Sequence, residues 1–244
     1  MPYRRLPNTD KARLRALERA FKKVESGSHE STPFSAGQIQ ILRTFLPRFQ
    51  NSITLLNAAR RNQIQNSSAY NGLLKKARMY VSHYIQVMNM AISRGEQKPA
   101  IRKFYKLEAF GNSLPPLNSE SDLLYWGKKV IDGDKERVSN GGSPLYNPSI
   151  ALVKVNFEKY SEANFRQKQF QQTTIRNANL VQELREEAND LIQNLWNEAE
   201  AAFEHLPDSL KRENAKQFGV VYAFRKSELK KPSNSSVVQQ ELIF

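Results

Sequence analysis

The longest uninterrupted pattern in the chain runs from Ser149 to Leu206, between an Asn147-Pro148 step and Pro207, and it contains no glycine and no proline. Both residues are strongly disfavoured inside helices, so a stretch without them favours helix. In its second half, apolar residues recur at spacings of three and four, as one buried face of a helix requires. These are Val181, Leu184, Ala188, Leu191, Ile192, Leu195, Ala199, Ala202 and Phe203.

A second long helical pattern begins at Ser35, which Gln38 follows three residues later as in a capping box. Its apolar face includes Ile39, Leu42, Phe45, Leu46, Phe49, Ile53 and Leu56. The pattern pauses at residues 66–68, resumes from Leu73 to Ile92 and stops at Gly95. Pro47 lies inside it and should kink the helix. We interpret residues 34–107 as a helical hairpin.

The two long patterns resemble each other. A shift of 107 residues places the apolar face that begins at Leu73 onto the face that begins at Leu180, and it sets residues 62–68 opposite residues 169–175. We therefore expect a second hairpin that turns near Gln171 to Thr174. Two duplicated hairpins would most simply bury their faces as an antiparallel four-helix bundle. The alternative is one continuous helix from 148 to 206 in an extended coiled coil.

The predicted fold is mainly α, with short helices around the bundle and at most one small β-hairpin. Val220 to Phe224 is the best strand candidate, because it is short and rich in branched and aromatic residues. Helices are also expected at 10–24, 119–131 and 208–218. The expected domains are a basic amphipathic N-terminal helix (1–33), hairpin repeat 1 (34–107), a connector with a short helix (108–146), hairpin repeat 2 with a short strand (147–226) and a C-terminal tail (227–244).

Charge adds a preference for acidic partners. The 244 residues include 37 Lys and Arg against 24 Asp and Glu, a net charge of +13. Such a balance raises affinity for nucleic acid, anionic membranes or acidic proteins. No span long enough to cross a membrane and no apolar core of a signal peptide is predicted, so we expect a cytoplasmic protein.

Catalytic and metal-binding patterns are not found in the sequence. There is no cysteine, the three histidines stand apart from one another, and no phosphate-binding, nucleophile or zinc motif occurs. We therefore predict no catalytic, cofactor-binding or metal-binding residues. Aromatic residues alternate with basic ones at 102–106 and 222–226, where core anchoring of the rings is favoured over base stacking.

Three segments carry a resemblance to known sequences: MPYRRLPNTDKARLRAL at the start, DLLYWGKKVIDG at 122–133 and NPSIALVKVNFEKY at 147–160. Together they resemble a set of uncharacterised bacterial helical proteins of unassigned function. The resemblance implies a helical fold and a cytoplasmic, bacterial origin. It implies no site residues.

The leading functional hypothesis is a non-enzymatic helical-bundle protein that acts as an interaction partner or scaffold. The alternative is a nucleic-acid-binding protein that uses the N-terminal helix and the first hairpin, with contacts from Arg13, Lys22, Lys75, Lys76 and Arg78. A third hypothesis is an enzyme or ligand carrier with a polar pocket between the hairpins. The sequence leaves the partner, protein or nucleic acid, and the oligomeric state open.

Overall fold

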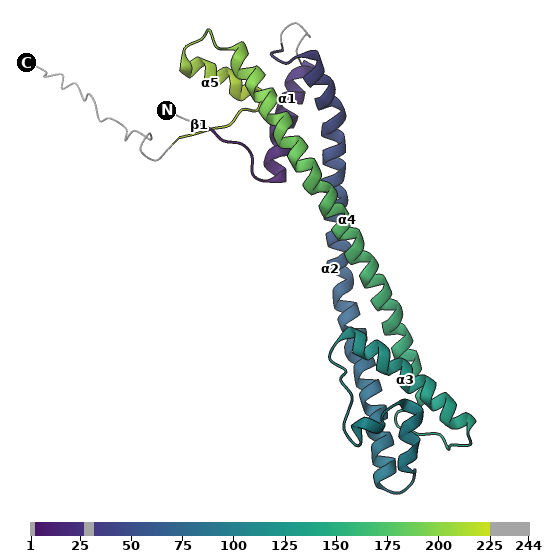
Figure 1. Cartoon of the computed structure of the whole chain (residues 1–244). Coiled ribbons are helices and arrows are strands. Elements are labelled where there is room, and N and C mark those ends of the chain that lie inside the picture. Colours follow the sequence, from purple (N-terminus) through teal and green to yellow (C-terminus); the bar gives the residue numbers. More distant parts are fainter. Residues whose placement is uncertain (1–2, 27–31, 225–244) are drawn as a thin grey trace, which may run out of the picture. The chain divides into compact units, whose positions relative to one another are not determined.

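The computed structural model describes residues 3–26 and 32–224, and most of them are helical (Figure 1). Two very long helices, α2 and α4, dominate the chain, and short helices and two short strands accompany them. In chain order the elements are β1 (Tyr3–Arg4), α1 (Asp10–Ser26), α2 (Ala36–Ser93), the 3₁₀ helices η2 (Pro99–Tyr105) and η3 (Glu108–Phe110), α3 (Glu120–Ser139), α4 (Ile150–Ala202), α5 (Asp208–Gln217) and β2 (Tyr222–Ala223).

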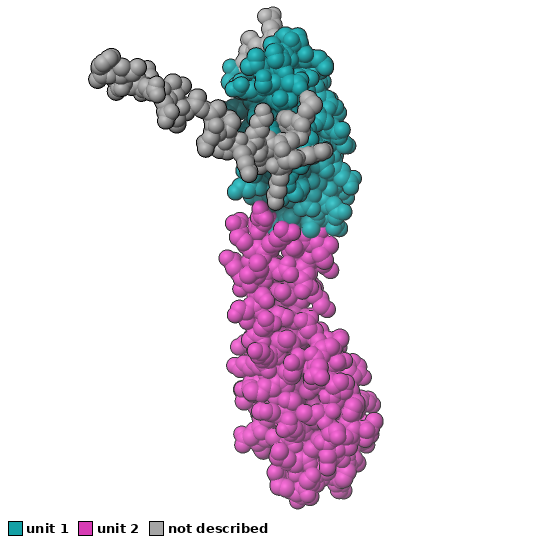
Figure 2. All heavy atoms as spheres, turned by 90° about the vertical axis from the view of Figure 1, so that its left-hand side faces the viewer, with its two compact units in different colours: residues 1–56, 177–244 teal, residues 57–176 magenta. Residues whose placement is uncertain are grey.

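The chain divides into two compact units, coloured separately in Figure 2. Unit 1 combines residues 1–56 with residues 177–244, and unit 2 is residues 57–176. Each long helix contributes one part to unit 1 and the other part to unit 2. The predicted division into two successive hairpin repeats therefore differs from the division that the structure shows.

The two predicted hairpin turns are wrong, because α2 and α4 each continue through them. The polar residues at these places do not end the helix. Their side chains bond back to backbone carbonyls four residues earlier: Asn66 Nδ2 lies 2.7 Å from Asn62 O, and Thr174 Oγ1 lies 2.9 Å from Phe170 O. Such bonds are compatible with helical backbone. The predicted bundle of four hairpin arms is accordingly not formed.

In sequence, the 107-residue shift aligns most of α2 with α4, so the two similar patterns fall in two long helices. α2 also continues through Pro47. The predicted starts of the helices agree with the structure. Thr9 Oγ1 accepts a bond from Ala12 N at 3.2 Å, and Ser35 Oγ accepts one from Gln38 N at 3.4 Å, which satisfies N–H groups that lack a partner within the helix.

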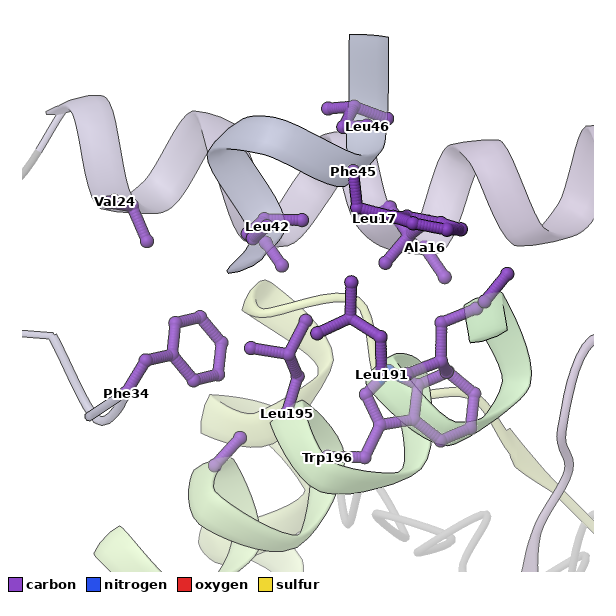
Figure 3. Packing of buried hydrophobic residues seen from close by; sticks show 14 of the residues in the cluster. Ala16, Leu17, Val24, Phe34, Leu42, Phe45, Leu46, Leu191, Leu195 and Trp196 are labelled. Carbon is purple, nitrogen blue, oxygen red and sulfur yellow. The ribbon is translucent and has the colours of Figure 1, made fainter. Parts of the chain in front are cut away.

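Unit 1 is built around an apolar core to which α1, α2, α4 and α5 all contribute. In Figure 3, side chains of α1 and α2 such as Leu17, Leu42 and Phe45 converge on Leu191, Leu195 and Trp196 of α4. Leu17 and Leu42 are completely buried, and Trp196 is 1% exposed. The apolar spacing of the second half of α4 is thus a core face, as the sequence predicts.

In unit 1, β1 and β2 form a two-stranded antiparallel sheet. Tyr3 pairs with Ala223 and Arg4 with Tyr222. The strand predicted at 220–224 is therefore confirmed in part, and its partner is β1, so the one small sheet of the described residues is not a β-hairpin. The predicted tail, 227–244, lies outside the described residues.

Unit 2 packs α3, η2 and η3 against its parts of α2 and α4. Ser119 begins α3 as predicted, because its hydroxyl accepts a bond from Asp122 N at 3.0 Å. The helix runs to Ser139, eight residues past the predicted end. Gly133, two residues past the predicted end, lets α3 approach η2: a Cβ atom there would lie 2.6 Å from Phe104 O.

Within each unit the parts of α2 and α4 run antiparallel. In unit 1, Ser35 bonds to Glu198 at the start of α2, Arg48 bonds to Glu187 further along, and Leu55 O accepts from Asn177 at 3.5 Å. In unit 2, Tyr70 OH accepts from Asn164 Nδ2 at 2.9 Å. Across the described part of the chain, no helix combines the length and apolarity that a membrane crossing requires.

Candidate nucleic-acid interface

Unit 2 carries most of the positive charge of the protein. Residues 57–176 include nineteen Lys and Arg against nine Asp and Glu, a net charge of +10 out of the total of +13. The rest of the chain holds eighteen basic and fifteen acidic residues, a net charge of +3. Charge is therefore segregated between the two units.

The long helices explain this segregation. The 58 residues of α2 include seven Arg and Lys but no Asp or Glu. α4 is acid-free from 163 to 182, between Glu162 and Glu183. Residues 148–176 carry a net charge of +3, whereas residues 177–206 carry −6. The acidic part of α4 belongs to unit 1, where Glu187 pairs with Arg48 and Glu198 accepts from Ser35.

Seven basic side chains form what we call the basic stretch of unit 2. All seven are exposed, and no ion pair joins any of them to a carboxylate within residues 3–26 and 32–224. Unpaired cations keep their full charge for a ligand in solution. The basic stretch consists of Arg60, Arg61, Lys75 and Lys76 of α2 and Arg166, Lys168 and Arg176 of α4.

A network of hydrogen bonds fixes the two helices beside the basic stretch. The hydroxyl of Tyr70 on α2 donates to Glu120 at the start of α3. Asn164 on α4 donates to Tyr70 OH at 2.9 Å and to Glu120 Oε2 at 3.0 Å. Since α2 and α4 are antiparallel at this point, residues 60–76 of α2 lie beside residues 160–176 of α4. The basic side chains of both helices therefore belong to one stretch of unit 2.

A second, fully buried network fastens α3 to α2 and η2. Asp134 Oδ1 accepts from Tyr84 OH at 2.5 Å, from Tyr105 OH at 3.0 Å and from Arg137 Nη2 at 2.7 Å. Arg137 Nε also donates to Tyr105 OH at 2.8 Å. Burial raises the pKa of Tyr105 to about 12 and the pKa of Tyr84 further, so both phenols are neutral. The network stabilises the unit and is not open to a ligand.

The five nucleic-acid contacts predicted from the sequence are divided between the two units. Arg13 and Lys22 lie in unit 1, and Lys75, Lys76 and Arg78 lie in unit 2. Arg13 is nearly buried, with Nε 2.8 Å from Asn189 Oδ1 and Nη1 3.6 Å from Asp10. Arg78 donates to Asn118 O at 2.8 Å. Lys22, Lys75 and Lys76 are exposed, and the two lysines of unit 2 belong to the basic stretch.

Five members of the basic stretch were not among the predicted contacts, and the three on α4, Arg166, Lys168 and Arg176, are hidden when charge is averaged over the whole of the second predicted hairpin. That average, −3, conceals the positive first half of α4. The signal was present in the sequence as the long interval between Glu162 and Glu183. This acid-free interval is visible in the sequence alone. It indicates a basic surface only once α4 is known to be one helix whose two parts lie in different units.

The tyrosines of the two segments in which aromatic and basic residues alternate are anchored in their units, which was the favoured interpretation, but Phe224 is 52% exposed. Tyr105 is completely buried in the network of Asp134, and Tyr222 OH donates to Glu200 at 2.6 Å. In unit 2, a ring outside these two segments is also exposed to solvent. Phe165, between Asn164 and Arg166 of the basic stretch, is 65% exposed. An exposed ring among cations is the arrangement on which single-stranded bases stack.

No group of histidines and carboxylates within the described residues is placed to hold a metal ion. Comparison of the chain with protein-family models, curated proteins and solved structures finds no match. The resemblance to uncharacterised bacterial proteins therefore stays a prediction.

Proposed function

We propose that the protein binds nucleic acid through the basic stretch of unit 2. The observation that carries this proposal is the segregation of charge, with a net +10 on residues 57–176 and seven exposed basic side chains without ion pairs to described carboxylates. Phosphate contacts dominate the affinity of proteins for nucleic acids, and exposed Arg and Lys supply them.

The dimensions of the stretch suit a nucleic-acid backbone. From Arg60 to Lys76, α2 rises about 24 Å at 1.5 Å per residue, a distance along which duplex DNA presents about seven base pairs. Neutral amides and hydroxyls fill the space between the cations, as in the run NQIQNSS at 62–68. Such groups also donate to phosphate oxygens. The expected mode is backbone recognition without a preference for sequence.

The test is a titration of the full chain with a fluorescent duplex and a single strand of mixed sequence over a range of salt concentrations. If about four phosphates are neutralised, raising the salt from about 50 to about 200 mM should weaken binding roughly 100-fold. A variant with Arg60→Gln, Arg61→Gln and Lys168→Gln should bind at low salt on the order of 10- to 100-fold more weakly, with a flatter salt dependence.

A matched control removes the same charge from unit 1. Lys11, Arg43 and Lys216 are exposed there, and no ion pair joins them to a carboxylate of the described chain. Their replacement by Gln should leave the affinity within about threefold of the natural protein, because the remaining effect is long-range and screened. Equal losses in the two variants would show that net charge alone is responsible, and absence of binding at low salt would end the proposal.

A variant of Phe165 tests whether the protein prefers single-stranded or duplex nucleic acid. Stacking of one base on an exposed ring contributes about 1–3 kcal/mol, whereas a duplex keeps its bases inside. The Phe165→Ala variant should therefore bind a single strand about tenfold more weakly and bind the duplex unchanged. An equal loss for both would assign Phe165 to packing or to general contact.

A protein-interaction scaffold is the second candidate, and exposed apolar side chains favour it. Ile64 is 72% exposed and Ile175 59% exposed, both in unit 2. Exposed apolar groups that gather in a patch mark interaction sites. A protein partner bound in this way should be cross-linked near Ile64 and lost in an Ile64→Ser, Ile175→Ser variant, while the Gln variant of the basic stretch retains it. The opposite result would favour the nucleic acid.

A further inference from the structure

Unit 1 holds a cavity of about 310 Å³ that none of the functions above uses. Three parts of the chain enclose it: the segment from Arg5 to Asn8, one face of α1, and the segment around Gly219 and Val221. Its volume lies at the lower end of the range for small-molecule sites in proteins. The cavity belongs to unit 1 alone, so it is independent of the basic stretch.

The walls of the cavity are held in place by backbone contacts. Arg5 N donates to Val221 O at 2.8 Å, beside the pairing of β1 with β2. Gly219 has a positive φ of 95°, and a Cβ atom on it would lie 2.6 Å from Ala16 O of α1. Only glycine suits both conditions without strain. The two terminal segments are thus fixed closely against α1.

The lining combines an apolar surface with three arginines. Ala12, Ala16 and Val221 contribute apolar surface, and Arg5, Arg15 and Arg19 contribute guanidinium groups. The positions 12, 15, 16 and 19 share one face of α1, since they are spaced by three and four residues. None of the residues that line the cavity is acidic.

The carboxylates nearest in sequence have other partners. Asp10 accepts from Arg185 Nε at 2.7 Å and Nη2 at 2.8 Å, and Glu18 accepts from Gln50 at 2.8 Å. Arg15 uses only Nε, at 3.3 Å from Lys11 O, so its two terminal nitrogens have no partner within residues 3–26 and 32–224. No ion pair to a described carboxylate involves Arg5 or Arg19 either.

We propose that this cavity binds a phosphate monoester that carries a small apolar group. Guanidinium groups match phosphate oxygens with paired hydrogen bonds, and three of them balance a dianion better than a single carboxylate. The apolar surface of Ala12, Ala16 and Val221 covers the remainder of the ligand. The same chemistry is offered by a free metabolite-sized ester and by the headgroup of an anionic lipid, which the test distinguishes.

The test is calorimetric titration of the full chain with hexyl phosphate, inorganic phosphate and hexanol. Hexyl phosphate should bind about tenfold or more tightly than inorganic phosphate, and hexanol should not bind. The Arg15→Gln, Arg19→Gln variant should lose about tenfold or more of the affinity for hexyl phosphate. An Ala12→Leu variant, which fills the cavity, should lose binding while keeping all three arginines.

The control is Lys11→Gln, Lys22→Gln, which removes the same charge from α1 at positions that do not line the cavity. It should bind hexyl phosphate as the natural protein does. Circular dichroism establishes that each variant is folded. Failure of hexyl phosphate to bind, or equal binding by the Arg15, Arg19 variant and the control, would overturn the proposal.

Vesicles containing phosphatidic acid distinguish a lipid headgroup from a free phosphate ester as the natural ligand. Co-sedimentation that the Arg15, Arg19 variant loses and the control keeps would support a lipid headgroup, whereas binding of hexyl phosphate alone would support a free ester. Either result leaves the nucleic-acid proposal untouched, because that proposal depends on variants of unit 2.

Discussion

At the scale of single residues, the ion pair of Asp134 and Arg137 is the most constrained feature of unit 2. The side chains are 4% and 1% exposed, and their nitrogen and oxygen lie 2.7 Å apart. Burial works to lower the pKa of Arg137, but hydrogen bonds from its guanidinium to Asp134 and to Tyr105 outweigh it, so the pKa is raised. Arg137 Nη1 also donates to Ser143 O at 2.6 Å, which ties the end of α3 to the following loop.

Removal of the anion should destabilise unit 2 strongly. Asp134→Asn keeps the shape of the side chain but leaves the buried guanidinium without a countercharge, a change that costs about 3–5 kcal/mol. The free energy of unfolding in urea measures the effect. Glu136→Gln, two residues away on the exposed side of α3, should change it by less than about 0.5 kcal/mol. Similar small changes in both variants would contradict the assigned role of Asp134.

The buried phenols predict a loss of stability in alkaline solution. The folded-state pKa of Tyr105 is raised to about 12 and that of Tyr84 is raised too, above the value of about 10 in the unfolded chain. The stabilisation is therefore complete below pH 10 and falls as the pH rises toward 12, by up to about 1.4 kcal/mol per pH unit for each group. Urea midpoints between pH 8 and pH 11 measure this; a flat profile would contradict the assignment.

At the scale of the elements, the sequence was informative about where helices start and which face they bury. Ser35 and Ser119 cap helices at the predicted starts, and Thr9 caps the helix that was expected at 10–24, since a cap depends on a few local residues. The error concerned the middle of α2 and α4. A pause in apolar spacing signals that a helix lacks a deep core there, and it does not mark the end of the helix.

The distribution of charge along α4 was also hidden by treating the helix as a single segment. The helix is basic before residue 176 and acidic after it, and a sum over the whole segment hides both. The division into units could not be predicted, because it depends on how distant segments such as β1 and β2 come together. The sequence therefore predicted that the candidate site is a basic surface, but it identified only two residues of the basic stretch, Lys75 and Lys76.

Two glycines inside helices should respond oppositely to alanine. At Gly133 of α3 a Cβ atom would lie 2.6 Å from Phe104 O and 2.8 Å from a ring carbon of Tyr105, so Gly133→Ala should destabilise unit 2 by about 1–3 kcal/mol. At Gly72 of α2 nothing lies within 4 Å, so Gly72→Ala should stabilise it by about 0.5–1 kcal/mol. Thermal unfolding midpoints of the two variants measure these effects. A change of stability in the same direction in both variants would refute the packing of α3 on η2.

At the scale of the whole molecule, the chain has two hydrophobic cores and two chemically different surfaces. The core of unit 1 gathers residues from both ends of the chain, and the core of unit 2 comes from its middle. The arginine-lined cavity belongs to unit 1 and the basic stretch to unit 2. The two proposed activities can therefore be removed one at a time.

The distribution of tryptophan makes the two cores separately visible. Of the two tryptophans in the sequence, Trp196 is buried in unit 1 and Trp126 in unit 2, where the ring of Phe110 lies 5.3 Å away. Trp126→Phe and Trp196→Phe variants thus each leave one tryptophan, whose emission reports on one core. Asp134→Asn should lower the urea midpoint of the emission from Trp126 and leave that of Trp196 unmoved, whereas a common shift would mean that both cores melt as one. The natural chain already contains the two optical probes that this experiment needs.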